Sequence, residues 1–447
     1  MFSKVLIANR GEIAVRVIRA CRDLGMRTVA VYSQADRDAL HVLLADEAVC
    51  IGPPPSRQSY LKPDRIISAA LITGADAIHP GYGFLAENAQ FAEICERSGL
   101  AFVGPPAASI RLMGDKSAAR RTAEAEGVPI LPGTRHPIRD LEEAKKLARE
   151  IGFPLIIKAS AGGGGKGMRV VSEPDEVESS LATAAAEAAG AFGDAAVYLE
   201  RYLPNPRHIE VQVLVDAAGN GVHLGERECS IQRRHQKLLE ESPSPAINES
   251  RRQAIGQAAL QVAKAAGYRN AGTVEFLLDA SGAFYFMEMN TRIQVEHPIT
   301  ESVTGVDLVQ SQFRLAAGEP LGFTQADVTL SGHSLECRIN AEDSERFLPT
   351  PGLLTALRLP GGPHVRVDTH AYAGYTIPQY YDSLLAKIIV HGPSRGEAIA
   401  YMLRALGETH IEGIQSTVPL HRRILEDADF RAGRTSTQFL PRLLGRT

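Results

Sequence analysis

Residues 273–296 read TVEFLLDASGAFYFMEMNTRIQVE, and this stretch decides the fold expected at the centre of the chain. Its segments 273–279 and 283–290 alternate apolar and polar residues with a period of two, which is typical of half-buried β-strands. Between them, residues 281–282 (SG) suit the two-residue loop of a tight turn. The stretch therefore predicts a β-hairpin.

This hairpin would bring two carboxylates face to face. With a two-residue loop, Glu275 lies opposite Glu288 and Thr273 lies opposite Asn290. Like charges directly opposed across a ladder are destabilising unless something compensates them. The side-chain oxygens of Glu275, Glu288 and Asn290 are hard ligands that suit Mg²⁺ or Mn²⁺ bridging nucleotide phosphates. We therefore predict a metal site on this face.

The alternative to a metal site is a solvated acidic face on an exposed edge strand. The other face of the first strand carries Val274, Phe276 and Leu278, which are strongly apolar and would bury the sheet. Burial of that face favours the metal site.

A glycine loop lies upstream, in the run FPLIIKASAGGGGKGMRVV at residues 153–171. The pattern predicts two strands joined by glycines 162–165, whose unhindered N–H groups can form an anion-binding nest. It is not a P-loop, because Lys166 is followed by Gly167 and a strand rather than by Ser or Thr and a helix. We expect a hinged flap over phosphates, with Lys158 placed to reach an anion; a flexible hairpin turn is the alternative.

The first 110 residues predict a doubly wound α/β domain. Strands are expected at 4–9, 28–32, 48–51, 77–79 and 101–103, and helices at 13–24, 63–73 and 89–97. Alternation of this kind gives a parallel sheet with helices on both faces. The first turn reads NRGEIA and not GxGxxG, so dinucleotide binding has little support.

The remaining elements follow from the same patterns. Helices are expected at 116–126, 141–151, 177–189, 250–266 and 395–406, and further strands at 196–200, 208–215 and 221–226. From about residue 334 strand patterns dominate until the last of these helices.

Composition excludes several functional classes. The 447 residues have a formal net charge of −4, which argues against a large basic face for nucleic acid. Five scattered cysteines form no CxxC pair, so we expect reduced thiols rather than disulfides or a zinc site. No signal-peptide pattern is present, and no apolar run approaches the roughly 20 residues that span a bilayer. We expect a cytoplasmic protein without a membrane or nucleic-acid partner.

Several longer motifs together resemble biotin carboxylase, the ATP-grasp component of acetyl-CoA carboxylase and related enzymes. They are MEMNTRIQVEHPITE (287–301), AGGGGKGM (161–168), HPGYGFLAEN (79–88) and ERECSIQRRHQK (226–237). The resemblance runs from ANRGEIA near residue 8 to PQYYDSLLAKIIVHG near residue 390. The glycine loop and the acidic hairpin alone would indicate only the wider ATP-grasp group.

The resemblance implies three domains. A Rossmann-like N-terminal domain would span residues 1–114, and an ATP-grasp domain residues 115–330, with its flap at about 131–204. A mixed α+β C-terminal domain would span 331–447.

It also implies a two-step reaction. Bicarbonate attacks the γ-phosphate of MgATP to give carboxyphosphate, and the carboxyl group then moves to N1′ of biotin. ATP and Mg²⁺ or Mn²⁺, expected as two ions, are the implied cofactors. No Met-Lys-Met biotinylation site occurs, so biotin is expected on a separate carrier protein, and the carboxyltransferase on another chain. Relatives are commonly homodimers. The final acceptor, whether acetyl-CoA, another acyl-CoA or pyruvate, is not visible in this chain.

Site residues are carried over position by position from the resemblance. The expected nucleotide contacts are Lys116, Lys158, Gly164, Gly165, Glu200, Arg201, Tyr202, Leu203, His208, Gln232, His235, Glu275 and Glu288. The implied metal ligands are Glu275, Glu288 and Asn290. The bicarbonate contacts are Lys237, Arg292, Gln294, Val295 and Arg338. The biotin contacts are Tyr82, as a wall, and Arg338, which also stabilises the enolate-like oxygen of the ureido ring.

Four of these residues are expected to take part in catalysis: Lys237, Arg292, Glu296 and Arg338. Glu296 is the implied general base that deprotonates bicarbonate. If residues 292–296 stay extended, Arg292, Gln294 and Glu296 share one parity and point toward one pocket.

Ordinary alternatives exist for single residues. The basic run at 232–237 could be a solvated face or a phosphate-backbone patch, and Arg338 could form a surface ion pair. His208 could be structural, and Cys229 could fill the core without a catalytic role. Arg201 stands where lysine is expected, and residues 434–440 are less apolar than an adenine contact requires.

Two rival functions also remain at this point. One is another ATP-grasp ligase that joins a carboxylate to an amine. The other is a regulatory subunit that binds nucleotide without turning it over.

Overall fold

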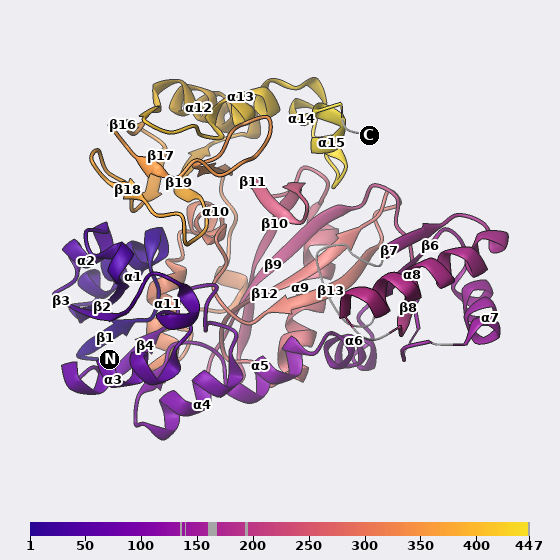
Figure 1. Ribbon diagram of the computed structural model, residues 1–447, viewed down its shortest axis with the longest axis horizontal. Helices are drawn as coiled ribbons and strands as arrows, with labels where there is room; N and C mark the ends of the chain where they lie inside the picture. Colours follow the sequence, from indigo (N-terminus) through magenta and orange to yellow (C-terminus); the bar gives the residue numbers. More distant parts are fainter. Residues whose placement is uncertain (135, 139, 160–167, 193–194, 446–447) are drawn as a thin grey trace.

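The structure, a computed structural model, describes residues 1–445 apart from 135, 139, 160–167 and 193–194 (Figure 1). Glycines 162–165 of the predicted loop, and with them Gly164 and Gly165, lie outside the described residues. No helix of the described part is both long and apolar enough to cross a membrane. All five cysteines are described and free, so the prediction of unpaired thiols is confirmed.

The N-terminal sheet has five parallel strands in the order β3-β2-β1-β4-β5. These strands are β1 (Lys4–Ile7), β2 (Arg27–Ser33), β3 (Glu47–Gly52), β4 (Ala77–His79) and β5 (Ala101–Phe102). The connecting helices are α1 (Gly11–Asp23), α2 (Leu40–Leu44), α3 (Pro63–Thr73) and α4 (Ala89–Arg97). Val5 and Ile7 of β1 share a core with α1, whereas Leu6 shares one with α3 and α4. Helices on both faces confirm the doubly wound fold.

The central sheet has eight antiparallel strands in the order β13-β12-β9-β10-β11-β14-β19-β17. The first five in this order are β13 (Phe284–Asn290), β12 (Asn270–Leu278), β9 (Arg207–Val215), β10 (Gly221–Arg233) and β11 (Gln236–Ser242). The last three are β14 (His333–Asn340), β19 (Leu384–Gly392) and β17 (Val365–Thr369). The sheet therefore continues across residue 330, where we expected a domain boundary.

The two faces of this sheet differ in chemistry. Ile209, Val211 and Val213 of β9 pack in one core with helices α6 (Lys116–Ala125) and α9 (Glu249–Ala265). The alternate residues of β9, Glu210 and Gln212, point to the other face and are fully buried there. That second face carries the candidate functional site.

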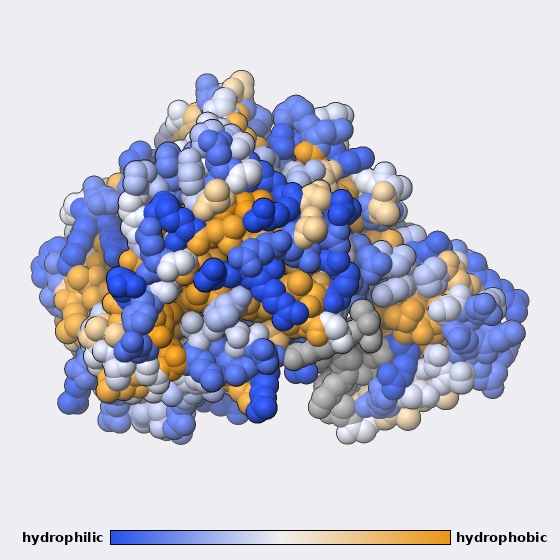
Figure 2. All heavy atoms as spheres, turned by 90° about the horizontal axis from the view of Figure 1, so that it is seen from above, coloured by the Kyte–Doolittle hydropathy of each residue, from blue (hydrophilic) through white to orange (hydrophobic). Residues whose placement is uncertain are grey.

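The flap is a small separate layer. Its strands β7 (Met168–Val171), β6 (Leu155–Ala159) and β8 (Val197–Arg201) form an antiparallel sheet, with helices α7 (Leu141–Ile151) and α8 (Val177–Phe192) in the same core. It projects from the rest of the molecule beside β13 (Figure 1), and its outer end is mainly hydrophilic when seen from above (Figure 2).

Residues beyond β14 complete the far end of the central sheet and cover it with helices. The helices are α12 (Arg395–Glu408), α13 (Val418–Glu426), α14 (Ala428–Arg431) and α15 (Phe439–Leu443). Two small ladders pair β15 (Gly352–Leu353) with β18 (Thr376–Ile377) and β16 (Ala356–Arg358) with β20 (His410–Glu412).

Sequence patterns missed several elements. They are α5 (Ala107–Gly114), α10 (His297–Thr304), α11 (Leu308–Ala316) and β11. The predicted strand 221–226 also ended too early, where polar residues begin. In the structure they continue β10, with Arg227 and Glu228 buried inside the molecule.

The central hairpin differs from its prediction in one detail. Near the turn, Leu278 pairs with Phe284 and Asp279 N donates to Ala283 O at 2.9 Å, so the predicted two-residue loop is wrong. The Asp279 carboxylate accepts from the backbone N–H groups of Ser281 and Ala283 and holds the wider turn.

A register shift between Glu275 and Phe276 then restores the predicted pairing. Glu275 lies opposite Glu288, and Thr273 lies opposite Asn290. The predicted opposition of the two carboxylates is therefore confirmed, although it depends on a bulge.

The ring of Phe276 should be a main support of this hairpin. It is fully buried and makes edge contacts with Phe284 and Phe286, at ring-centroid distances of 5.6 and 6.3 Å. Phe276→Ala should therefore lower the midpoint of thermal unfolding, since removing such a ring costs about 3–5 kcal/mol. Leu71→Ala, at a site that is 56% exposed, is the control. Equal midpoints for the two variants in circular dichroism melts would contradict this account.

Candidate functional site

The site is organised around one buried ammonium group. Lys237 Nζ, from β11, lies 2.9 Å from Glu275 Oε1 of β12 and 2.6 Å from Glu296 Oε1 at the start of α10. It also donates to the carboxylate of Glu210 on β9, and to Gln294 Oε1 at 3.2 Å. Four segments that are distant in the sequence therefore meet at one cation.

This arrangement fixes the charges of its members. Burial opposes the charge of Lys237, yet the carboxylates of Glu210, Glu275 and Glu296 hold its pKa well above the usual range. In spite of burial, Lys237 and its neighbouring cations hold the pKa of Glu275 and of Glu296 well below the usual carboxyl range. Glu210 differs, because burial and the charge of Glu296 raise its pKa.

Arg227 of β10 pairs with Glu210, one of the carboxylates around Lys237. The sequence analysis assigned Arg227 no role. It is fully buried. It also donates to Gln212 Oε1 and Thr300 Oγ1, both at 2.9 Å, and to Thr273 Oγ1 at 3.1 Å. A sequence signal exists, since Arg227 shares strand parity with Cys229, for which core filling was the ordinary alternative.

Glu296 is held between two cations. One carboxylate oxygen contacts Lys237, and the other accepts from Arg338 Nη2 at 2.8 Å. Arg338 also donates through Nε to Glu240 Oε1 at 2.6 Å. Burial, followed by the charge of Glu296, raises the pKa of Glu240 to about 7. The surface-pair interpretation of Arg338 is wrong, because both of its carboxylate partners are fully buried.

The condition that residues 292–296 stay extended is not met. Glu296 has φ −80° and ψ 10° and turns into the helix, with Pro298 in its first turn. Gln294 and Glu296 still reach Lys237. The parity argument fails for Arg292, whose guanidinium turns toward Glu87 and Asn290.

Glu87 explains the position of Arg292. Arg292 Nε donates to Glu87 Oε2 at 2.9 Å, and Nη2 donates to Asn290 Oδ1 at 3.1 Å. Glu87 also accepts from Thr291 N at 3.1 Å. The sequence analysis gave no role to Glu87, although it lies in the HPGYGFLAEN motif.

Glu275 is the most heavily bonded carboxylate of the hairpin. Besides Lys237, it accepts from Asn290 Nδ2 and Gln294 Nε2, both at 2.9 Å, and lies 3.0 Å from His208 Nε2. The prediction that Asn290 lies beside the carboxylate pair is thus confirmed.

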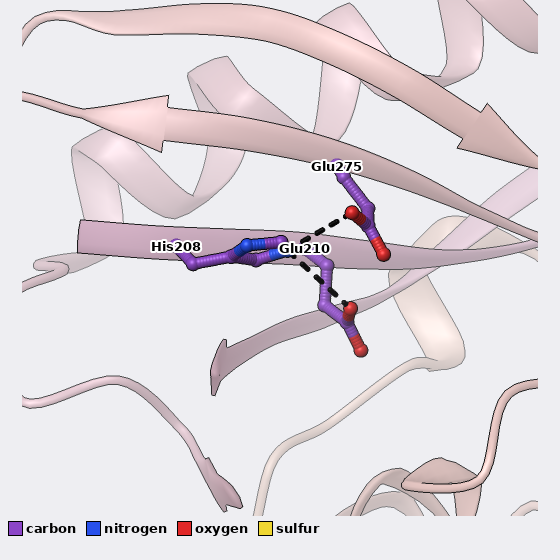
Figure 3. Close-up of side chains that lie close together, drawn as sticks. All are labelled: His208, Glu210 and Glu275. Carbon is purple, nitrogen blue, oxygen red and sulfur yellow. Dashed lines mark ion pairs between the residues drawn. The ribbon is translucent and has the colours of Figure 1, made fainter. Parts of the chain in front are cut away.

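His208, Glu210 and Glu275 lie close enough to suggest a metal site (Figure 3). His208 Nε2 is 3.0 Å from Glu275 Oε2 and 4.0 Å from Glu210 Oε2. Both carboxylates already share the Lys237 ammonium. Although burial opposes it, Glu275 raises the pKa of His208, so that a protonated His208 forms an ion pair with Glu275. His208 is therefore a partner of Glu275.

Glu288 fits a divalent cation better. Its side chain is 37% exposed, and Lys116 Nζ lies 3.9 Å away. Burial and the opposed charge of Glu275 raise the pKa of Glu288. A cation between the two carboxylates would relieve this repulsion, and the amide oxygen of Asn290 adds a third hard donor. The residues present thus fit Mg²⁺.

An ion-pair cluster lies on the flap side of the site. Lys158 and Arg120 both pair with the carboxylate of Glu200, and Arg120 also donates to Leu131 O at 2.8 Å. Lys158, expected to reach a phosphate, is therefore held by Glu200 in this structure. Arg201 donates to Ile151 O at 3.2 Å, within the flap.

The other expected nucleotide contacts lie at strand ends. Tyr202 and Leu203 follow β8 and are half-buried. In the run 232–237, Gln232 and Lys237 are buried, whereas His235 is exposed at the turn with φ 68°. The alternative of a uniformly solvated basic face is therefore excluded.

Tyr82 lies on the N-terminal side of the site. Its hydroxyl donates to the Glu12 carboxylate, and both residues line a cavity of about 140 Å³. Asn9, Gly11 and His370 also line this cavity. It lies where the strands β1 and β4 end, at the point where the strand order of the doubly wound sheet reverses, a usual ligand position in such folds.

Three family models match the chain. Residues 1–110 match the N-terminal domain of biotin carboxylase, and residues 336–442 match its C-terminal domain. Residues 115–324 match the ATP-binding domain of the carbamoyl-phosphate synthase L chain.

Full-length relatives agree with these matches. Biotin carboxylase of Haemophilus influenzae is 57% identical over 446 residues, which cover 100% of this chain and 99% of the relative. The solved biotin carboxylase–β,γ-ATP complex of Campylobacter jejuni has 48% identity and a TM-score of 0.93, with 99% of each chain covered.

A second solved structure contains further ligands. It is the biotin carboxylase domain dimer of 2-oxoglutarate carboxylase from Hydrogenobacter thermophilus, in complex with MgADP, ADP and bicarbonate. Its identity to this chain is 49% and its TM-score 0.92, with 99% of each chain covered.

Removal of the central ammonium should change how stability depends on pH. In the wild-type protein, Glu275 and Glu296 have lowered pKa values, so their contribution is present above about pH 4.3 and is lost as the pH falls further. In Lys237→Met, three buried carboxylates lose the cation that they share, while Glu210 keeps Arg227 and Glu296 keeps Arg338, so their folded-state pKa values rise. As the pH rises from about 5 to about 7.5, the variant should therefore lose stability relative to the wild-type protein, and removing one partner of a buried ion pair costs about 3–5 kcal/mol.

Thermal midpoints at the two pH values measure this effect. Lys145→Met is the control, because Lys145 pairs with Glu142 and Glu178 at the surface. If Lys237→Met and the wild-type protein show the same difference between the two pH values, the proposed charge balance is wrong.

Proposed function

Since this chain belongs to the biotin carboxylase family, we propose that it uses MgATP and bicarbonate to carboxylate biotin. Bicarbonate is activated as carboxyphosphate, and the carboxyl group is transferred to N1′ of biotin. The observation that carries this proposal is the position of Glu296, an ionised buried carboxylate between Lys237 and Arg338. That constellation suits a base that works on a bound anion.

Glu296 would act as the general base. With both of its oxygens bonded to cations, its pKa is too low for strong basicity. A bicarbonate that binds Lys237 and Arg338 would share their charge and so weaken their hold on Glu296. The pKa of Glu296 would then rise, and its basicity would appear only when the substrate is in place.

Arg338 would contact both substrates in turn. Its planar guanidinium matches the two oxygens of a carboxylate-like anion and stays charged throughout the reaction. The same group can stabilise the oxygen of the ureido ring as negative charge develops there. Gln294 and the backbone N–H of Val295 would complete the bicarbonate contacts, and Arg292, held by Glu87 and Asn290, would border them.

The nucleotide would bind between the central sheet and the flap. Glu275, Glu288 and Asn290 would hold Mg²⁺, which neutralises charge on the phosphates when bound. Lys116 and Lys158 would add positive charge there, so that Lys158 must exchange its pairing with Glu200 for a phosphate. Further nucleotide contacts are proposed at Gly164, Gly165, Glu200, Arg201, Tyr202, Leu203, His208, Gln232 and His235.

The proposal extends to partners and organisation. We propose a homodimer that works with a separate biotin carrier protein and a separate carboxyltransferase, in the cytoplasm. The solved Hydrogenobacter domain with 49% identity is a dimer, which supports the first of these points. The domain limits 1–114, 115–330 and 331–447 also stay predictions.

One assay separates this function from its rivals. Release of ADP from MgATP should require bicarbonate and should rise when free biotin is added. A ligase that joins a carboxylate to an amine would not need bicarbonate, and a regulatory subunit would release no ADP. A rate that is indifferent to bicarbonate and to biotin would refute the assignment.

Arg338→Ala should separate biotin carboxylation from nucleotide binding. Loss of a charged hydrogen-bond donor costs about 1.5–3 kcal/mol, so the rate with free biotin should fall at least about tenfold. The affinity for ATP, measured by calorimetry, should stay close to that of the wild-type protein. Arg252→Ala is the matched control, because Arg252 also pairs with a fully buried carboxylate, that of Glu226, but on the α9 side of the sheet. An equal loss of ATP affinity and of carboxylation in Arg338→Ala would contradict this role.

A further inference from the structure

The mechanism above leaves one fully buried cation unexplained. Lys387, on β19, has no exposed surface and lies close to three acidic residues. Burial opposes its charge, but the carboxylates of Glu12, Glu336 and Asp368 raise its pKa. Burying an ammonium group costs free energy unless its charge and its N–H donors are paired with good geometry. The contacts of Lys387 therefore indicate a specific role.

On one side, Lys387 holds the loop that would bind bicarbonate. Lys387 Nζ donates to Val295 O at 2.8 Å. The preceding carbonyl, Gln294 O, accepts from His297 Nδ1 at 2.7 Å. Both carbonyls are thus fixed by fully buried side chains.

This anchoring sets the direction of a proposed bicarbonate donor. In a trans peptide the C=O and N–H groups point to opposite sides. Because His297 holds Gln294 O, the N–H of Val295 in the same peptide must point away from His297. Lys387 fixes the next peptide in the same way, so that residues 294–296 keep one orientation.

On its other side, Lys387 reaches the biotin-side wall. It forms an ion pair with Glu12 Oε1 at 3.2 Å. The same carboxylate accepts a hydrogen bond from Tyr82, and Glu12 and Tyr82 line the cavity of about 140 Å³. Glu12 belongs to α1 and Tyr82 to the loop after β4. Lys387 therefore connects the N-terminal domain to the loop before α10.

We propose that Lys387 is a positioning residue that ties the bicarbonate-binding loop to the biotin-side wall, through Val295 on one side and the Glu12–Tyr82 pair on the other. The inference rests on the proposed function, since it assigns a common support to two of its substrate sites. Lys387 touches neither substrate. It fixes the distance between the two surfaces that must present carboxyl donor and acceptor to each other, and small errors in that distance are costly.

The test is a set of steady-state measurements on the full chain. Lys387→Met keeps the length of the side chain but removes its charge and its donors. The KM for bicarbonate and the KM for free biotin should each rise about tenfold, as expected for loss of a charged hydrogen bond. The KM for ATP should change less than about twofold, because the contacts of Lys387 are with Val295, Glu12 and Asp368, which are outside the set proposed for the nucleotide. A rise confined to kcat, or equal rises in all three KM values, would overturn the proposal.

A double-mutant cycle tests the link itself. Glu12→Gln keeps an acceptor for Tyr82 but removes the ion pair with Lys387, so it should raise the KM for biotin more than that for bicarbonate. In the Lys387→Met background, Glu12→Gln should have little further effect on the KM for biotin, because the link is already broken. Additive effects would show that the two residues act separately. If Lys387→Met does not fold, Glu12→Gln alone decides: an unchanged KM for biotin overturns the proposal.

Two controls complete the design. Arg252→Met also deprives a fully buried glutamate of its cation, so it should lower the thermal midpoint without changing any KM value. If it moved the KM values in the same way, the effect of Lys387→Met would be structural only. Wild-type protein that shows no bicarbonate-dependent release of ADP would refute the proposed function, whereas active wild-type protein with an unaffected Lys387→Met variant would refute only this inference.

Discussion

The structure depends on the ammonium of Lys237 among three buried carboxylates. Each of Glu210, Glu275 and Glu296 comes from a different segment, and none could be buried as a charged group without a cation nearby. The long side chain of Lys237 reaches all three from β11, so β9, β11, β12 and the start of α10 must keep one arrangement. Arg227 and Arg338 extend the same balance to either side. The fold on this face of the sheet is therefore set by electrostatic pairing, and the opposite face by apolar packing on α9.

This balance also fits the base role proposed for Glu296. In that proposal, the pKa of Glu296 stays low while Lys237 and Arg338 are paired with it alone, and rises when a bound anion shares their charge. The same reasoning applies to Lys158 on the flap, which pairs with Glu200 and would exchange that partner for the proposed phosphate. In both proposals the charged side chain is paired with a fixed protein group, rather than with water, until a substrate displaces that group. Such a site needs little rearrangement when its ligands bind.

Periodicity was sufficient for much of the fold. Helices α3, α4 and α7 have the predicted limits, since each has a clear apolar stripe and clear ends. The site was harder to derive: alternation placed Glu275 opposite Glu288, but the position of Arg292 depends on Glu87, about two hundred residues away in the sequence. The turn before α10 and the buried second half of β10 were not predicted, for the same reason. Their polar residues are buried by distant partners, which a local pattern cannot represent.

The unbroken eight-stranded sheet has a consequence for how such chains can be divided. Strands β11 and β14 pair directly, with Leu239 beside Cys337 and Glu240 beside Glu336, although they lie on either side of residue 330. A fragment cut at that point would present the unpaired backbone of β11 as a free edge, and such edges recruit other strands. It would also lose Arg338, the partner of Glu240 and Glu296. The units visible in the sequence are therefore not separable pieces, and a chain split at residue 330 would break the sheet.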